Sequence, residues 1–307
     1  MRFLARYAMR GPFHAAVLAA AMLLGSLSIG LLTILSGAVV ALTTLRHGSR
    51  EGVRVLAVAA PLAVVVRMLL GGPGLPTLVL CLVVWLPSWL MAVNLKRTGR
   101  QALPLLLIAA LVAAYALAMR TAVGDVSAFW GERLESLFAL IARDGGPQLG
   151  AEQLSAVAQQ MHAWTLVAMF CVLASIIFLA RWWQATLYNP GGFGSEFRGL
   201  RLPRAMLVVA AAVAVAVVID RGGQGGSLAF ASDAFVVVVV LFAFQGLAVL
   251  HARAHAISLA KGWLTGLYVL LVLTPQIVGP ILAATGVADG VADFRRLTPR
   301  SRGGQDQ

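Results

Sequence analysis

The residues best suited to recognising a ligand lie in the stretch 181–204, which separates two apolar segments. Glycine backbone amides beside arginine side chains can cradle an anion. The glycine spacing is not that of a phosphate loop, which needs a Lys-Ser/Thr pair after a longer glycine spacing. Two interpretations stay open: a structural turn that also marks topology, or a contact with a ligand or partner. The candidate residues are Tyr188, Asn189, Gly191, Gly192, Glu196, Arg198 and Arg201.

The histidines and cysteines offer little for metal chemistry. His251 and His255 are four residues apart and therefore share one face of a helix. Zinc normally needs three or four ligands, and the sequence has no Cys, Asp or Glu near this pair. Cys81 and Cys171 stand alone inside apolar segments, which is typical of packing residues. We therefore expect neither a metal site nor a cofactor.

Few ionisable or polar side chains fall inside the apolar segments. Arg67 and Asp233 lie near segment ends, where they can extend toward water or pair with another charge. Gln245 and Tyr115 lie deeper, and a single polar residue there usually bonds a neighbouring helix. The sequence has no intramembrane carboxylate pair, no His-Glu-x-x-His and no serine elbow. We expect no enzyme and no catalytic residues.

The composition decides which elements must position these residues. Of 307 residues, 60% are hydrophobic and 12% are charged, and the mean hydropathy is +0.88. A soluble domain carries about 25% charged residues. Helices are the expected spanning form, because isolated strands would leave backbone groups unpaired in lipid. The sequence predicts an all-α polytopic transmembrane helical bundle of about 8–10 spans, in a single membrane domain over residues 1–307. The apolar segments are 13–45, 53–70, 77–94, 102–119, 163–180, 205–219, 228–250 and 262–288.

Two of these segments are too long for one upright helix. Residues 13–45 would make a helix of about 50 Å, against a hydrocarbon core of about 30 Å. Gly25-Ser26 can break the first segment, and the Thr-Pro and Gly-Pro pairs ending at Pro275 and Pro280 can break the second. With both segments read as hairpins, the chain makes about ten crossings and both termini are cytoplasmic.

The positive-inside rule supports this topology, because basic residues collect in cytoplasmic loops. The two-hairpin arrangement places 19 of the 24 Lys and Arg residues inside, whereas two single tilted helices would move the seven terminal arginines outside and leave 12. The 19 are Arg2, Arg6, Arg10, Arg46, Arg50, Arg54, Lys96, Arg97, Arg100, Arg181, Arg198, Arg201, Arg204, Arg253, Lys261, Arg295, Arg296, Arg300 and Arg302.

One sizeable segment, 121–162, is expected outside as an extracytoplasmic amphipathic helical insertion. Trp130, Leu134 and Phe138 recur at helical spacing, and charged residues fill the other faces. A second short helix is expected over about 152–161. Either the two helices lie on the outer membrane surface, or they form a lid over an outward-facing cavity.

The formal net charge of +12 has a simple explanation in a membrane protein, because basic loops meet anionic headgroups. No basic stretch is interleaved with aromatic residues, so nucleic acid is not an expected partner. Residues 296–307 are expected to form a disordered basic tail. The predicted location is the bacterial inner (cytoplasmic) membrane, with multiple passes and membrane lipids as partners.

Three sequence stretches carry a resemblance to a known family. They are Tyr188-Asn189-Pro190-Gly191-Gly192-Phe193 with Glu196-Phe197-Arg198 and Leu200-Arg201-Leu202, then Leu45-Arg46-His47-Gly48, and Gly290-Val291-Ala292-Asp293-Phe294-Arg295-Arg296. Over nearly the whole chain the sequence resembles the YybS-like, or DUF2232, bacterial membrane proteins. That family is distantly similar to the substrate-binding membrane subunits of energy-coupling-factor vitamin transporters, which implies a compact helical bundle with a solute pocket. The extra spans and long outer segment depart from a six-helix subunit, and no pocket residue or substrate carries over.

Three functions are compatible with these observations. The first is solute binding or transport by a bundle like those transporter subunits, with a small-molecule solute as partner. The second is a non-enzymatic membrane scaffold that recruits cytoplasmic protein partners through 181–204. The third is an enzyme acting on lipid or isoprenoid phosphates, with loop arginines as an anion clamp. An enclosed cavity beneath 121–162 would favour transport.

Overall fold

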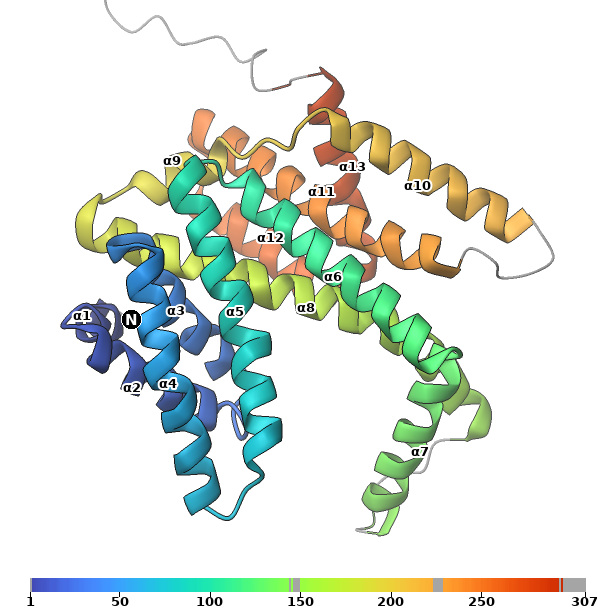
Figure 1. The fold of residues 1–307 in the computed structure, drawn as a ribbon. Helices are drawn as coiled ribbons and strands as arrows, with labels where there is room; N and C mark the ends of the chain where they lie inside the picture. Colours follow the sequence, from blue (N-terminus) through green and yellow to red (C-terminus); the bar gives the residue numbers. More distant parts are fainter. Residues whose placement is uncertain (1, 144, 146–149, 223–228, 293, 295–307) are drawn as a thin grey trace, which may run out of the picture.

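A computed structural model of the chain describes residues 2–143, 145, 150–222, 229–292 and 294. These residues form thirteen α-helices and no strand (Figure 1), which confirms the all-α prediction. The predicted tail at 296–307 lies outside the described residues. The helices are α1 (Arg2–Ala8), α2 (Pro12–Gly25), α3 (Leu32–His47), α4 (Ser49–Leu69), α5 (Gly74–Thr98), α6 (Ala102–Val123), α7 (Val126–Arg143), α8 (Ala151–Tyr188), α9 (Gly192–Arg198), α10 (Ala205–Gly222), α11 (Ala229–Ala256), α12 (Lys261–Leu273) and α13 (Pro275–Ala292).

Five of the described helices, α4, α5, α6, α8 and α11, are long and apolar enough to cross a membrane. They indicate a multi-pass membrane protein. The other predicted spans are helical too, but α2, α3, α10 and α12 are shorter apolar helices. The 14 residues of α2, for example, reach about 21 Å, less than the hydrocarbon thickness of about 30 Å. Of the roughly 8–10 predicted spans, five are thus matched by helices long enough to cross the bilayer.

The first long apolar segment folds as two helices, as its length and Gly25-Ser26 predict. The helix α2 stops at Gly25, where the Ser26 hydroxyl donates to the Leu23 carbonyl at 2.6 Å. After a short turn α3 packs back on α2, and the buried Ser36 hydroxyl donates to the Ala19 carbonyl at 2.7 Å. This bond ties the two helices together inside an apolar core.

The last long apolar segment also breaks, at one of its two predicted sites. Thr274 separates α12 from α13, and Pro275 is the first residue of α13, where a missing backbone N–H is tolerated. The predicted break at Gly279-Pro280 is wrong, because Pro280 lies inside α13. Proline within an apolar helix is tolerated where neighbouring groups satisfy the freed carbonyl.

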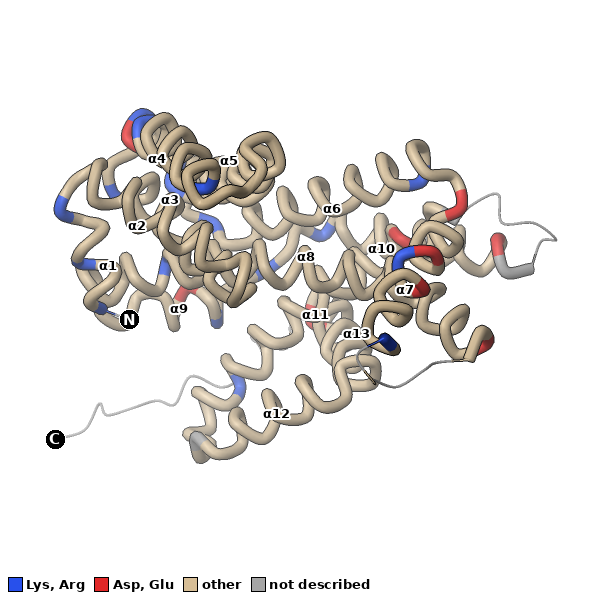
Figure 2. Tube along the Cα trace, turned by 90° about the horizontal axis from the view of Figure 1, so that it is seen from below, with Lys and Arg blue, Asp and Glu red and all other residues tan. Residues whose placement is uncertain are grey.

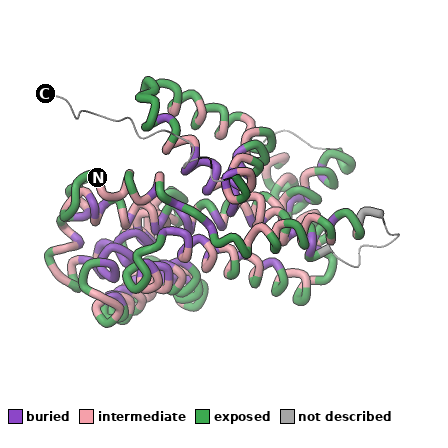
Figure 3. The backbone as a smooth tube through the Cα atoms, turned by 90° about the horizontal axis from the view of Figure 1, so that it is seen from above, coloured by how far each residue is buried: buried purple, intermediate pink, exposed green. Residues whose placement is uncertain are grey.

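The core lies between α2, α3, α5 and the second half of α8. Trp85 of α5 is fully buried and donates its indole N–H to the Ser36 hydroxyl of α3 at 2.8 Å. A Cβ atom at Gly37 of α3 would lie 2.7 Å from both Ile176 Cδ1 and Ser88 Oγ, so α3, α5 and α8 meet at this glycine. Buried turns occupy the inside of this bundle, while outward turns are exposed (Figure 3).

The helices α11 and α13 approach each other even more closely. A Cβ atom at Gly246 would lie 1.9 Å from the Leu282 carbonyl oxygen, and one at Gly286 would lie 2.2 Å from the Phe242 carbonyl oxygen. Small residues allow helix backbones to touch in this way in membranes. Gln245 beside this contact donates its amide to the Gly286 carbonyl at 3.0 Å and to Asp289 Oδ2 at 3.1 Å. The prediction that Gln245 bonds a neighbouring helix is confirmed.

The long helix α8 runs between two ends of the fold, each named here after a helix that lies there. At the "α9 end", α8 meets α9 and the loops that join α3 to α4 and α5 to α6. At the "α7 end", the first turns of α8 lie beside α7, the last turn of α6 and the first turns of α11 (Figure 1). The 38 residues of α8 span about 57 Å, so part of it extends beyond a bilayer core of about 30 Å.

The amphipathic helix expected in 121–162 is present as α7. Its Leu134 packs with Leu154 and Ala158 of α8, and Trp130 and Phe138 cover this small second core. The short helix expected at 152–161 is not a separate element, because α8 begins at Ala151 and continues unbroken through the next apolar segment. The apolar face of α7 is thus turned toward α8.

Candidate functional site

Most of the stretch 181–204 is helical. The helix α8 continues to Tyr188, which makes 181–188 its last two turns. The predicted turn is present: Asn189 ends α8, and Gly191 adopts a left-handed φ of 87°, a conformation that glycine adopts without strain. Gly192 and Arg198 are the first and last residues of the seven-residue helix α9, and exposed Arg201 follows it.

The candidate residues Glu196 and Tyr188 contact other parts of the chain. Glu196 of α9 pairs with the guanidinium of Arg181, whose Nε lies 2.9 Å from Glu196 Oε2, and it also accepts a 2.9 Å bond from Gln101. The guanidinium carbon of Arg46 lies 4.1 Å from the centre of the Tyr188 ring. These contacts join α9 to the loop after α5, and the end of α8 to the last turn of α3. Three loops that the charge rule assigns to one side of the membrane therefore share one end of the fold.

The histidine pair behaves as a packing feature in the part of the chain described. His251 lies edge-on to Phe197 of α9 at 5.4 Å between ring centres, and its Nε2 lies 3.2 Å from the Tyr268 hydroxyl. His255, one turn further, is exposed. Among the described residues, no three His, Cys, Asp or Glu side chains gather where a metal ion would sit.

The strongest cluster of charged side chains lies at the α7 end and was not predicted as a site. Arg120 of α6 forms a two-pronged ion pair with Asp233 of α11. Its guanidinium Nε donates to Oδ2, and its Nη2 donates to Oδ1 at 2.9 Å. His162 of α8 adds a third group, with Nε2 3.4 Å from Asp233 Oδ2. Asp233 and His162 are each only 5% exposed. Three helices thus place an arginine, a carboxylate and an imidazole together.

The imidazole of His162 packs against an aromatic ring, but its two nitrogens lack good hydrogen bonds in the part of the chain described. Its ring stacks on that of Tyr115 with 6.4 Å between centres and an interplanar angle of 28°. Within the described part of the chain, neither ring nitrogen has a hydrogen-bond partner of good geometry. The 3.4 Å separation from Asp233 exceeds the usual range of about 2.7–3.2 Å. A buried polar group without a protein partner is destabilising unless a water molecule or a solute satisfies it.

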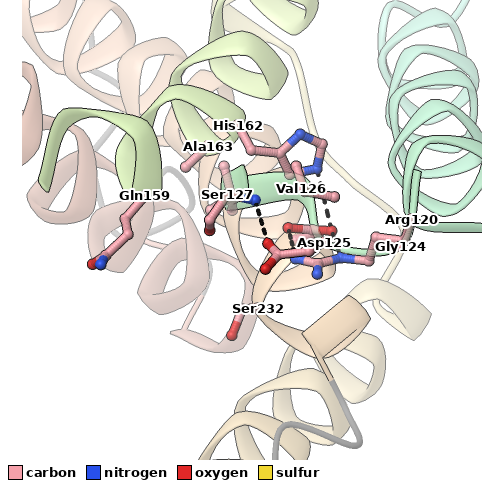
Figure 4. A pocket seen from close by; sticks show the side chains of 11 residues that line it. Arg120, Gly124, Asp125, Val126, Ser127, Gln159, His162, Ala163 and Ser232 are labelled. Atoms are coloured by element: carbon pink, nitrogen blue, oxygen red, sulfur yellow. Dashed lines mark hydrogen bonds and ion pairs between the residues drawn. The ribbon is translucent and has the colours of Figure 1, made fainter. Parts of the chain in front are cut away.

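A cavity of about 240 Å³ opens directly beside this cluster (Figure 4). Its walls come from α6, α7, α8 and α11, and they include Arg120, Asp233 and His162 together with Asp125, Ser127 and Gln159. At about 30 Å³ per liquid water molecule, the space holds roughly eight waters or one small solute. The cavity is partly open rather than enclosed, with exposed Asp125, Ser127, Gln159 and Ser232 around it.

The turn between α6 and α7 shapes one side of the cavity. Gly124 ends α6 with φ of 73° and donates its N–H to the Arg120 carbonyl at 2.9 Å. The next residue, Asp125, accepts the N–H groups of Ser127 and Ala128 through Oδ1 at 2.9 and 3.0 Å. This is the usual capping arrangement at a helix start. It fixes the Asp125 carboxylate at the mouth of the cavity.

A second cavity of about 380 Å³ continues from the first between α7 and α8. The two share Asp125, Ser127 and Gln159, so they form one connected depression. The second cavity adds Glu132 and Glu135 of α7, both exposed. We call the connected depression the α7 groove. It runs from the surface of α7 down to His162 and Asp233.

Sequence reasoning found one member of this site. Asp233 was expected either to extend toward water or to pair with another charge; it pairs, but its partners Arg120 and His162 were not identified. The available signal was that all three residues fall at span ends predicted on the same side of the membrane. No protein-family model, curated protein or solved structure matches the chain. The resemblance to the YybS-like family therefore stays a prediction.

Proposed function

We propose that this membrane protein binds a small polar solute in the α7 groove, as a solute-binding or transport protein of the bacterial inner membrane. The observation that carries this proposal is the cavity lined by Arg120, Asp233 and His162, with the last two almost fully buried. A cavity lined by several convergent polar groups is the usual form of a small-molecule site. The cavity lies beside the turn between α6 and α7 and the first turn of α7.

Buried ionisable groups near a membrane support a functional role. Such groups are destabilising unless they pair, and they commonly mark solute or ion pathways. The pair of Arg120 and Asp233 is satisfied internally, whereas His162 keeps ring nitrogens without good partners among the described residues. A solute that bonds His162 would therefore gain a contact that the unliganded protein does not make.

The distribution of basic residues supports an external position for this site. The loops that meet at the α9 end carry the arginines and lysines that the positive-inside rule places in the cytoplasm. The α7 groove lies at the other end of α8. The solute would thus enter from outside the cell.

A thermal-shift screen of the purified protein against small metabolites tests the proposal. Binding of a solute raises the unfolding temperature according to its concentration relative to its Kd. Ala163 lines the cavity, so Ala163→Phe should fill it and abolish the shift. The matched control is Ala156→Phe, on an exposed face of the same helix, which should keep the shift. If no metabolite shifts the wild-type protein, or if Ala163→Phe keeps every shift, the proposal is wrong.

A further inference from the structure

The lining of the α7 groove differs in charge from the rest of the chain. It contains four of the chain's 12 acidic residues, namely Asp125, Glu132, Glu135 and Asp233, but only one of its 24 Lys and Arg residues, Arg120. Four carboxylates against one guanidinium give the lining a formal net charge of −3. Figure 2 shows several acidic residues near α7, whereas basic residues are frequent near α1 to α4. In a protein of net charge +12, this groove is a local exception.

The single arginine of the groove is not a suitable anion receptor. The Nε and Nη2 groups of Arg120 both donate to Asp233. The carboxylate balances the charge of the guanidinium and occupies the pair of donors that would bind an anion in the same two-pronged way. The Asp125 carboxylate accepts two neutral backbone N–H groups, and the contacts described here include no cationic side chain that offsets its charge. An anion entering the groove would pass Glu132 and Glu135 and then meet Asp125. A cation would be attracted along the same path.

The buried histidine defines what the cation should look like. When the Nε2–H of His162 points toward Asp233, its Nδ1 carries a lone pair and accepts a hydrogen bond. The ring is fixed by its stacking on Tyr115, so the position of this acceptor is fixed as well. A ligand N–H group would satisfy it once the side chains that cover this nitrogen in the unliganded protein move aside. A bare metal ion is a poorer fit, because no three metal-ligating side chains gather in the described part of the chain.

We propose that the solute of the α7 groove is a small primary or secondary organic ammonium ion. Its N–H group bonds His162, its charge is balanced by Asp125, and the carboxylates of Glu132 and Glu135 draw it in. This inference rests on the proposed solute-binding function and specifies its substrate class.

Three size-matched probes test the charge class directly: n-butylammonium, 1-butanol and butyrate. Their affinities for the purified full-length protein are measured by calorimetric titration at low salt. We expect n-butylammonium to bind at least tenfold more tightly than the other two, and salt to weaken its binding. Tighter or equal binding of butyrate or 1-butanol would overturn the ammonium assignment and leave the solute-binding proposal standing. If none of the three probes binds, the ammonium assignment fails, and a metabolite screen without any hit removes the proposed function as well.

Two substitutions at one position test the role of the imidazole. His162→Phe keeps an aromatic ring against Tyr115 but removes the acceptor, and His162→Gln keeps an acceptor. We expect His162→Phe to weaken n-butylammonium binding by about tenfold or more, because it removes a hydrogen bond to a charged group, and His162→Gln to restore part of the affinity. Unchanged affinity in His162→Phe contradicts the assignment. Should that variant not fold, the exposed pair Glu132→Gln with Glu135→Gln gives a second test: it must lower both the affinity and its salt dependence.

Discussion

The close contact between α11 and α13 predicts that adding a single methyl group there lowers the stability of the protein. Gly246 of α11 and Gly286 of α13 face each other's backbones, so replacing either with alanine places a Cβ atom against a carbonyl oxygen. For Gly246→Ala the distance to the Leu282 oxygen would be 1.9 Å, whereas ordinary contact begins at 3.4 Å. The helices must therefore separate locally by about 1.5 Å, the difference between these distances, because backbone cannot rotate away as a side chain can.

The size of the effect follows from what this separation disrupts. Overpacking a tight contact is destabilising by about 1–3 kcal/mol. The two hydrogen bonds of Gln245 to Gly286 and Asp289, now 3.0 and 3.1 Å long, would stretch out of range. Side-chain bonds between membrane helices contribute about 0.6 kcal/mol each on average. Together, Gly246→Ala and Gly286→Ala should each lower the free energy of unfolding by about 2–4 kcal/mol.

The assay is the unfolding midpoint of purified protein in mild detergent, followed by tryptophan fluorescence or gel filtration. The control is Gly266→Ala in α12, where a Cβ atom meets nothing within 4 Å and helix propensity improves. We expect the control to match or exceed the wild type and both test variants to fall well below it. Equal stability of all four proteins would refute the close packing of α11 on α13.

Three further changes probe the rest of the fold. Asp233→Asn should destabilise by about 3 kcal/mol, because it leaves Arg120 partly buried without its carboxylate, and adding Arg120→Gln should recover part of the loss in a double-mutant unfolding cycle. Trp85→Phe should lower stability by about 1–2 kcal/mol by removing the indole bond to Ser36, measured by the same unfolding assay, and a neutral result would contradict that bond. Glu196→Gln should loosen α9 from the bundle and increase protease cleavage near 189–191, whereas unchanged cleavage would show that its pairing is unimportant.

Local sequence patterns predicted most helices because each apolar run carries its own signal. Length and Gly25-Ser26 located the first helix break, and Pro275 the second, since these residues change backbone geometry where they stand. The continuity of α8 past 161 was not predictable in this way. No glycine or proline marks that position, and whether a polar helix joins the next apolar one depends on its packing against α7.

The candidate site was harder to predict because its members are far apart in sequence. Arg120 and Asp233 are separated by 113 positions, and their pairing depends on how α6 and α11 pack. The sequence drew attention instead to the glycines and arginines of 181–204, whose residues are adjacent. In this stretch, Glu196 and Tyr188 contact other helices of the fold. A motif read from neighbouring residues can thus mark a structural junction.

The most direct test is the side of the membrane from which the groove can be reached. Ser232 lines the cavity and Ser195 lies exposed at the α9 end, so each is replaced with cysteine in a Cys171→Ala background. A membrane-impermeant thiol reagent is added to intact cells and to inside-out vesicles. We predict that Ser232→Cys is labelled in intact cells and that Ala163→Phe suppresses this labelling, while Ser195→Cys is labelled only in inside-out vesicles. Labelling of Ser232→Cys from the cytoplasmic side alone would contradict an outward-facing solute site.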